Sequence, residues 1–260
     1  REFSCESVPT MTYRVGGVIL TKEKVFISHE NRILIKYTLV EAHSDTTLQF
    51  RPFLAFRNAN DLCMENGAID TSVRPAENGI ATCLYKGYPD LYMQFSKPAV
   101  WTNDGHWYKG IEYYKDRVRG IPYKEDLWVP GYFEIPIRKG ESVIFSASTS
   151  ECLPMDFQST YDRELATRTC RTSFYNCLKN SAKQFYLKNR NGLYIMAGYP
   201  WFNVRARDEL IALPGCTIAI NHREEYERIL DTFIKALFRY IDEETTDRVI
   251  HEIDLPDIPL

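Results

Sequence analysis

The sequence contains no apolar run that approaches the length of a membrane span, and it has no excess of basic residues. A bilayer-spanning helix needs about 20 mainly apolar residues in a row, so we expect no transmembrane segment. The formal net charge is −3 and the sequence pI is about 6.0. Nucleic-acid-binding proteins usually present a basic patch or stripe. The charge balance therefore argues against nucleic acid as a partner, and the lack of a long apolar run argues against a membrane.

Paired cysteine motifs are absent as well. The seven cysteines are odd in number and irregularly spaced, none of them forms a CxxC pair, and no signal peptide is visible. Disulfide frameworks are typical of secreted chains with regular cysteine pairs. The sequence therefore predicts reduced thiols in a cytoplasmic protein, with one or two incidental disulfides as the alternative.

The spacings that mark common catalytic sites are also missing. The five histidines lie far apart, and no two of them have the i, i+4 spacing that places two metal ligands on one helix face. There is no GxSxG motif, no cysteine beside a histidine, and no glycine-rich loop that leads through Lys-Ser/Thr into a helix. We therefore expect no metal site and no other cofactor, and the sequence indicates neither a nucleophile nor a phosphate loop.

The composition is that of an ordinary globular protein. The chain has 260 residues, of which 44% are hydrophobic and 26% are charged, so it can bury a core in one or two domains. Residues 10–56 have the pattern of β structure. Gly16 and Gly17 separate two strand-like segments, and because glycine tolerates the positive φ angles of a tight turn, they predict a hairpin. The segment HENR, which begins at His29, predicts a second hairpin.

Strand-like segments continue to about residue 150. Pro52 lies in one of them, TLQFRPFLAF, and indicates an edge strand or a bulge. Short strands separated by turn signals are typical of an antiparallel β-sandwich. The polar segments 57–78 and 97–107 are predicted to be loops, and either could lie over a binding surface. The other expected strands are IATCLY, LYMQFS, WYKGIEYY, LWVPGYFEIPI and SVIFSAS.

After about residue 150 the hydrophobic period becomes helical. One helix is predicted from Asp162 as N-cap to a residue just before Gly192. The segment ELIALPGCTIAI also has a helical pattern, although Pro214 must kink or break it. A clear amphipathic helix is predicted over 223–244. Its apolar stripe consists of Ile229, Phe233, Leu237 and Tyr240/Ile241.

These patterns predict two parts, a β-sandwich over 1–152 and an all-α segment over 153–260. The chain starts at Arg1, directly before strand-like sequence, and stops in the apolar stretch IDLPDIPL. We therefore expect a piece of a longer polypeptide, with a sandwich that is truncated at its start.

The stretch AGYPWFNVRARDELIALPG, residues 197–215, combines an aromatic cluster with charged residues where a helix is predicted to begin. One interpretation is purely structural: Asp208 caps the helix, Arg207 forms a surface ion pair, and Trp201 and Phe202 belong to the core. The other interpretation is a sugar site. Planar aromatic rings cover the apolar faces of a pyranose, and an adjacent Arg and Asp offer donors and acceptors to vicinal hydroxyls.

The stretch resembles the signature that opens the catalytic domain of bacterial and archaeal glycogen debranching enzymes of the amylo-α-1,6-glucosidase type. That family usually reads Gly-Tyr-Pro-Trp-Phe, four residues often ending in Trp-Gly, then Arg-Asp and Ile-Ala-Leu-Pro-Gly. In this chain Arg205 stands where Trp is usual, and Ala206 where Gly is usual. Residues 13–58 and KGYPDLYMQFS at 86–96 are similar to the family's N-terminal domain. IDLPDIPL resembles the segment that leads into the next helix of the family's barrel.

The resemblance implies a fold and a reaction. The fold is an antiparallel β-supersandwich followed by the first helices of an incomplete (α/α)6 toroid, as in glucoamylases. The reaction is hydrolysis, with inversion, of the α-1,6-linked glucose at branch points of glycogen or limit dextrin. Partners would be these α-glucans and maltooligosaccharides.

The resemblance also implies substrate-binding roles. Arg207 and Asp208 would bind hydroxyls of the non-reducing glucose, Trp201 would wall the pocket, and Tyr199 would support it. Arg205 would border the same pocket, where it changes the aromatic platform that the usual Trp provides.

The catalytic acid and base of the resembling enzymes lie downstream of this motif. We therefore expect them outside this chain, and we expect the piece alone to be inactive. Asp208 receives no proton-transfer role. Glu224, Glu225 and Glu227 are interpreted as acids that the dipole of the following helix favours.

Two alternatives remain at the level of sequence. The chain could be a non-catalytic carbohydrate-binding module, in which the sandwich binds the sugar, or a structural sandwich that orders a helical domain. Apolar surface left open by an incomplete toroid could also drive self-association of the piece.

Overall fold

The computed structural model describes residues 1–59, 61–198 and 202–242. It divides into two compact units, Arg1–Thr167 and Arg168–Leu260. The predicted domain boundary between residues 152 and 153 stays a prediction, because a division into compact units does not show which segments fold independently. Within the described residues, no helix has the length and apolar character that crossing a membrane requires.

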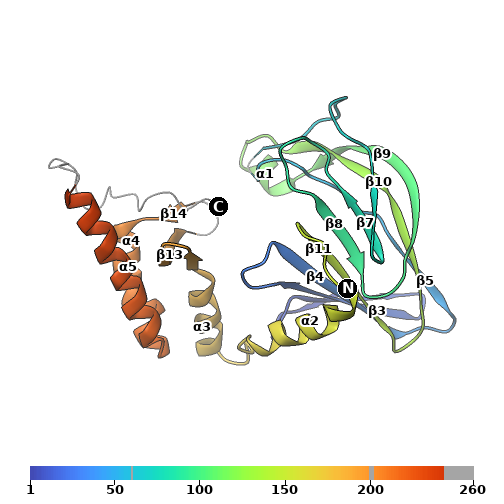
Figure 1. Cartoon of the computed structure of the whole chain (residues 1–260). Helices are drawn as coiled ribbons and strands as arrows, with labels where there is room; N and C mark the ends of the chain where they lie inside the picture. Colours follow the sequence, from blue (N-terminus) through green and yellow to red (C-terminus); the bar gives the residue numbers. More distant parts are fainter. Residues whose placement is uncertain (60, 199–201, 243–260) are drawn as a thin grey trace. The chain divides into compact units, whose positions relative to one another are not determined.

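The first unit contains two antiparallel sheets (Figure 1). In the described residues, the larger sheet has the strand order β1-β2-β3-β4-β11-β8-β7-β6 and the smaller has the order β5-β10-β9. The strands are Glu2–Ser4 (β1), Thr10–Val15 (β2), Val18–Phe26 (β3), Arg32–Glu41 (β4), Thr46–Phe50 (β5), Arg74–Ala76 (β6), Gly79–Thr82 (β7), Leu91–Phe95 (β8), Val100–Glu112 (β9), Lys124–Ile137 (β10) and Ser142–Ser148 (β11). The helical turns are Tyr114–Val118 (α1), Pro154–Asp156 (η1) and Phe157–Ala166 (α2).

The two sheets pack face to face around one hydrophobic core. Leu39 and Phe95 from the larger sheet are fully buried against Phe133 and Ile135 of β10. The rings of Phe95 and Phe133 lie 4.9 Å apart in an edge-to-face arrangement, which is a favourable geometry for aromatic pairs. This half is therefore the antiparallel sandwich that the strand pattern predicts.

Both predicted hairpins are confirmed. Gly16 and Gly17 have φ angles of 54° and 81°, and they join β2 to β3 where Val15 pairs with Val18. The second turn carries His29 at φ 64°. The segment with Pro52 departs from a continuous strand, because β5 ends at Phe50 and the chain returns to β10 only in an isolated bridge at Leu54.

The prediction of a loop over 97–107 is wrong. Most of this segment belongs to β9, which pairs along its length with β10, for example Trp101 with Phe133 and Trp107 with Trp128. The polar run from Asn103 to Gly105 is exposed. Polar residues are compatible with a strand that has a solvent-facing side, and the sequence pattern did not distinguish them from loop residues.

Helix α2 packs on the larger sheet and so belongs to the first unit. Phe157 and Tyr161 are buried in a second core cluster with Val25 and Ile144 of the sheet. The carboxylate of Glu164 accepts hydrogen bonds from the backbone N–H and the hydroxyl of Ser28, at 3.1 and 3.0 Å.

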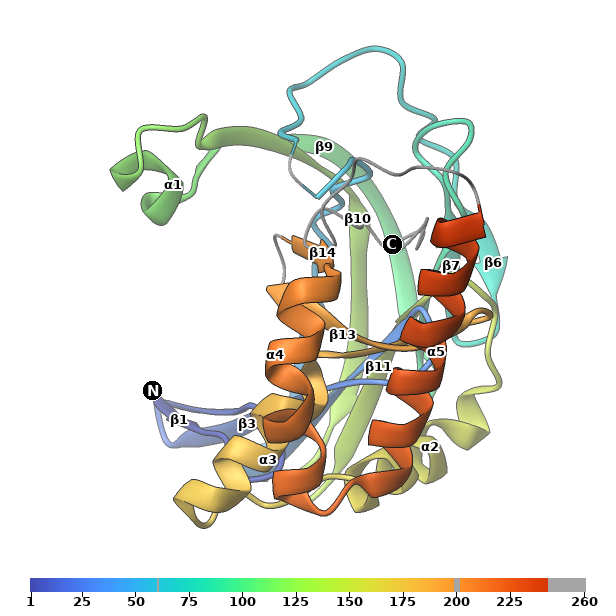
Figure 2. The same ribbon diagram turned by 90° about the vertical axis from the view of Figure 1, so that its left-hand side faces the viewer.

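The second unit combines a short sheet with helices. The described strands form an antiparallel sheet in the order β12-β13-β14, and α4 and α5 lie side by side against β13 (Figure 2). The elements are Phe174–Gln184 (α3), Tyr186–Asn189 (β12), Gly192–Gly198 (β13), Phe202–Val204 (β14), Ala206–Cys216 (α4), Ile218–Ile220 (η2) and Arg223–Asp242 (α5).

The single helix predicted from Asp162 to before Gly192 is wrong. The region contains α2, α3 and β12, and Asp162 lies inside α2 rather than at its cap. Ser173 caps α3 instead, because its hydroxyl accepts from the N–H of Asn176 at 3.1 Å. Asn189 pairs with Gly192 across a two-residue turn at Arg190 and Asn191, and its side chain accepts from the N–H of Gly192 at 3.1 Å. A hairpin therefore forms where the helical spacing predicts the end of a helix.

The second unit is therefore not all-α, and the sheet β12-β13-β14 is a correction to that prediction. The amphipathic helix predicted over 223–244 is confirmed as α5 through Asp242, with Ile229 and Phe233 buried. Pro214 does not end α4, which continues to Cys216. The fold as a whole remains what the sequence predicts in outline: antiparallel sheets followed by helices.

Candidate functional site

The predicted sugar-binding stretch runs from β13 through β14 into the first turn of α4. Tyr199 and Trp201 lie outside the described residues, so their wall and support roles stay predictions. Phe202 is 50% exposed, so its interpretation as a core residue is wrong. The remaining three candidates, Arg205, Arg207 and Asp208, lie within four consecutive positions at the start of α4.

Asp208 is not the N-cap of α4. The capping position belongs to Arg205, whose backbone is extended at φ −128° and ψ 128°, and no side chain caps the helix there. Asp208 lies within the first turn, where its negative charge is favoured by the exposed backbone N–H groups and the helix dipole. The correction leaves the carboxylate available for a ligand, because it is not bound to the helix as a cap.

Arg205 lies over the ring of Phe202, with its guanidinium carbon 5.0 Å from the ring centroid. This is a cation–π contact between two exposed side chains. The residue that stands where the family usually has Trp thus contacts the exposed ring of Phe202.

Arg207 is exposed and Asp208 is half-buried. Within residues 1–59, 61–198 and 202–242, neither side chain has a hydrogen-bond or ion-pair partner. The predicted surface ion pair of Arg207 is therefore not formed with a described residue. Two neighbouring side chains of opposite charge that keep their donors and acceptors open are suited to a polyhydroxyl ligand.

Glu209 is the residue at this site that sequence reasoning missed. It follows Asp208 directly, yet it is fully buried, and its Oε2 accepts a hydrogen bond from the N–H of Ile195 on β13 at 2.8 Å. Oε1 has no hydrogen-bond partner in the described part of the chain. Burial raises the pKa of this carboxyl to about 7, and the Ile195 hydrogen bond opposes that change.

The buried carboxyl connects α4 to the strand that leads into the aromatic segment. Glu209 thereby fixes the first turn of α4, and with it Arg207 and Asp208, relative to β13. Below the turn, Leu213 of α4 packs with Ile195 and with Ile229 of α5 in one core cluster. The candidate side chains therefore project from a fixed helix end.

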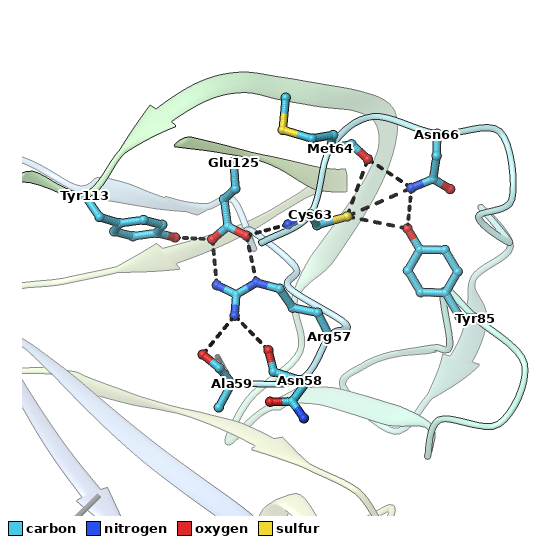
Figure 3. Close-up of polar contacts among 9 residues, drawn as sticks. All are labelled: Arg57, Asn58, Ala59, Cys63, Met64, Asn66, Tyr85, Tyr113 and Glu125. Carbon is cyan, nitrogen blue, oxygen red and sulfur yellow. Dashed lines mark hydrogen bonds and ion pairs between the residues drawn. The ribbon is translucent and has the colours of Figure 1, made fainter. Parts of the chain in front are cut away.

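A second polar cluster lies in the first unit, on the segment 57–66 that the sequence predicts to be a loop (Figure 3). Nε and Nη2 of Arg57 donate to the two oxygens of the buried Glu125 carboxylate at 2.7 and 2.8 Å. The same carboxylate accepts from the N–H of Cys63 at 3.2 Å and from the hydroxyl of Tyr113. We call this cluster of Arg57, Cys63, Tyr113 and Glu125 the Glu125 clamp.

The Glu125 clamp holds the loop to β10 from several sides. Nη1 of Arg57 donates to the backbone oxygens of Asn58 and Ala59 at 3.1 and 3.3 Å. The neighbouring Asp126 accepts from the N–H groups of Glu65 and Gly110 at 2.9 and 2.8 Å. The pKa of Glu125 is lowered, mainly by the hydrogen bonds from Arg57. The carboxylates of Glu125 and Asp126 hold the loop in place, and their hydrogen bonds are made to the protein itself.

None of the seven cysteines, all of which are described, forms a disulfide. Among the described residues there is also no group of three or more His, Cys, Asp or Glu side chains that would hold a metal ion.

Comparison with known proteins covers both units. Residues 1–144 match the family model described as glycogen debranching enzyme N terminal. Residues 178–240 match the model described as amylo-alpha-1,6-glucosidase, and this segment includes β13, α4 and most of α5. No curated protein compared with the chain matches it. The first match spans more than half of the chain.

Proposed function

Since the chain belongs to the glycogen debranching enzyme family, we propose that its second unit holds the terminal glucose of an α-glucan between the Arg207–Asp208 pair and the neighbouring aromatic residues. The open donors and acceptors of Arg207 and Asp208 at the fixed start of α4 carry this proposal. Arg207 offers a planar fork of N–H donors to sugar hydroxyls, and Asp208 accepts from the adjacent ones. Trp201 and Tyr199 are proposed as the wall of the pocket and its support.

The proposed reaction is hydrolysis of the single α-1,6-linked glucose at a branch point, with inversion. One carboxylic acid protonates the leaving oxygen as the glycosidic bond breaks, and a second carboxylate removes a proton from the attacking water. Inverting enzymes keep these carboxyl groups about 6.5–9.5 Å apart so that the water fits between them. We assign neither role to Asp208 or Glu209, because Asp208 is the proposed acceptor for sugar hydroxyls and Glu209 is fully buried.

The family match supports α-glucan as the substrate class, and three finer statements are proposals. We propose that α3, α4 and α5 are early helices of an (α/α)6 toroid. We propose that the 260-residue chain binds glucan without cleaving it. We also propose a cytoplasmic location, supported by seven cysteines without a disulfide.

Incubation of the 260-residue chain with limit dextrin is expected to release no glucose, because Arg207, Asp208 and their aromatic neighbours bind the sugar and transfer no proton. A coupled glucose assay over a day at high protein concentration makes this measurement, with an active glucoamylase as positive control. Glucose release above the background without protein would contradict the proposal, since it would show that this chain contains the acid and the base of the reaction.

A further inference from the structure

The first unit has a pocket at the end of the sandwich whose walls combine exposed aromatic rings with polar side chains. The hollow measures about 260 Å³ and lies where the chain leaves β5 and where it enters β8. Its walls include Phe53, Phe56 and Tyr88 together with Arg57, Asp90 and Thr149. We call these six residues the aromatic pocket.

Two of the three aromatic rings of this pocket are exposed to solvent. Phe53 is 45% exposed and Tyr88 is 44% exposed, and the ring of Tyr88 lies 6.1 Å from that of Phe56 at an angle of 61°. Phe53 also contacts an aromatic residue outside the pocket: its ring lies 4.7 Å from the ring of Tyr108, which is 41% exposed. Exposed aromatic surface of this kind is usually associated with ligand or partner binding.

The polar side chain Asp90 suits the pocket to a ligand that carries hydroxyl groups. The Asp90 carboxylate is partly exposed and forms an ion pair with Nη2 of Arg74 at 2.5 Å. The carboxylate has further acceptor sites, and the Arg74 fork has further donors. Arg74 does not itself line the pocket, and its ion pair holds in place the Asp90 carboxylate, which does.

A larger hollow of about 500 Å³ lies next to this pocket and shares Phe53, Leu54 and Leu91 with it. Its walls are mainly aliphatic and aromatic, and unlike those of the smaller pocket they include, among the described residues, no carboxylate to accept from sugar hydroxyls. A sugar placed there would leave hydroxyls without partners, which is costly. The smaller aromatic pocket is therefore the better match to a carbohydrate.

The Glu125 clamp makes the aromatic pocket a preformed site. Arg57 lines the pocket, and all three of its guanidinium nitrogens are used in holding the loop to β10 and to itself (Figure 3). Phe56 precedes Arg57 directly, so its ring starts from the same fixed backbone. A wall that is already ordered loses little conformational freedom when a ligand binds.

We propose that the aromatic pocket binds glucose units of an α-glucan chain and so gives the sandwich a second glucan site, separate from Arg207 and Asp208. Sugar rings stack on Tyr88 and Phe53, and their hydroxyls donate to the Asp90 carboxylate, which Arg74 holds in place. The choice of α-glucan as the ligand rests on the proposed function, whereas the geometry of the pocket does not. Such a site holds the enzyme on a branched polymer while individual ends are processed.

The test measures retardation of the 260-residue chain in native gels that contain glycogen, with maltoheptaose as soluble competitor. Tyr88→Ala and Asp90→Asn are each expected to weaken glycogen binding about tenfold, the order of effect of removing an aromatic anchor or one polar partner. Tyr114→Ala is the matched control, because Tyr114 is 76% exposed on α1 of the same unit and is not part of the aromatic pocket. It is expected to leave the retardation unchanged.

Repeating the series in an Asp208→Asn background separates the two sites. Retardation that persists in Asp208→Asn and disappears when Tyr88→Ala is added supports the pocket, whether or not Asp208→Asn alone has an effect. If Asp208→Asn has none and the added Tyr88→Ala abolishes retardation, the pocket stands and the proposed site at Arg207 and Asp208 fails. Unchanged retardation in both Tyr88→Ala and Asp90→Asn, or no retardation of the wild-type chain, overturns the pocket proposal.

Discussion

Glu125→Gln is expected to lower the free energy of unfolding of the first unit by about 3 kcal/mol, the low end of the cost of breaking a buried ion pair. Glu125 is fully buried and Arg57 is 18% exposed, so removal of the carboxylate leaves a guanidinium with little access to water. Cys63 and Tyr113 lose a charged acceptor in the same step. Urea titration followed by tryptophan fluorescence measures this, because Trp101, Trp107 and Trp128 all belong to this unit.

Glu134→Gln is the control for this experiment. Glu134 lies on the same strand, and its carboxylate accepts from Nε2 of Gln49 at 3.3 Å in an exposed position. A change within about 0.5 kcal/mol is expected for such a surface substitution. Equal effects of the two substitutions would contradict the account of the Glu125 clamp, since they would show that the buried ion pair contributes no more than a surface hydrogen bond.

Wild-type protein is expected to lose about 3 kcal/mol of stability relative to Glu209→Gln as the pH rises from 4.5 to 7, because each pH unit between the two pKa values corresponds to about 1.4 kcal/mol. Glu209 has a pKa of about 7 in the fold against 4.5 as its ordinary value. Between these values the unfolded chain releases the proton and the folded chain keeps it, so a higher pH favours unfolding. The contribution is therefore fully present below pH 4.5 and is lost as the pH rises to about 7.

The glutamine variant keeps an acceptor for the Ile195 N–H and does not titrate. Urea titrations of both proteins at pH 4.5, 6 and 8, followed by the helical circular dichroism signal, give the difference curve. Glu227→Gln serves as the control, because Glu227 is 63% exposed in an ion pair with Arg223, and its difference curve is expected to be nearly flat. A flat difference curve for Glu209→Gln as well would show that this carboxyl is not held in a buried, protonated form.

The fold was predictable wherever local patterns and packing agree. The sandwich strands alternate apolar and polar residues, and the pair Gly16–Gly17 adopts the positive φ angles for which glycine is suited. Helix α5 has a clean apolar stripe, which α4 and β13 cover. In these segments the periodicity that drives burial and the local turn chemistry point to the same structure.

The predictions failed where those two signals conflict. Residues 186–191 lie at the end of the predicted helix, yet they form β12 and the turn that leads back into β13. The run Asn103–Gly105 is polar but still lies within β9. Asn103 pairs with Gly131 and the following His106 with Val129 on β10, on either side of a register shift. Long-range pairing of this kind leaves no local pattern in the sequence.

The sequence predicted which residues gather at the candidate site, but not which of them occupies the cap position and which acid is buried. Arg205, Arg207 and Asp208 do lie together at the start of α4, but the cap belongs to Arg205 and the buried acid is Glu209. In sequence, Asp208 and Glu209 are two adjacent acids in a first turn. Which of them faces the core depends on how α4 sits on β13, and that follows only from the packing around Ile195 and Leu213.

The most direct test of the central claim is calorimetric titration of the 260-residue chain with maltoheptaose, comparing Asp208→Asn with Asp231→Asn. Both acids lie on helices of the second unit, and Asp231 forms a surface ion pair with Lys235 one helical turn further along α5. The account predicts that Asp208→Asn weakens the second-unit site at least tenfold, whereas Asp231→Asn leaves both binding steps as in the wild type. Identical isotherms for the wild type and Asp208→Asn would contradict the claim that the start of α4 holds a glucose unit.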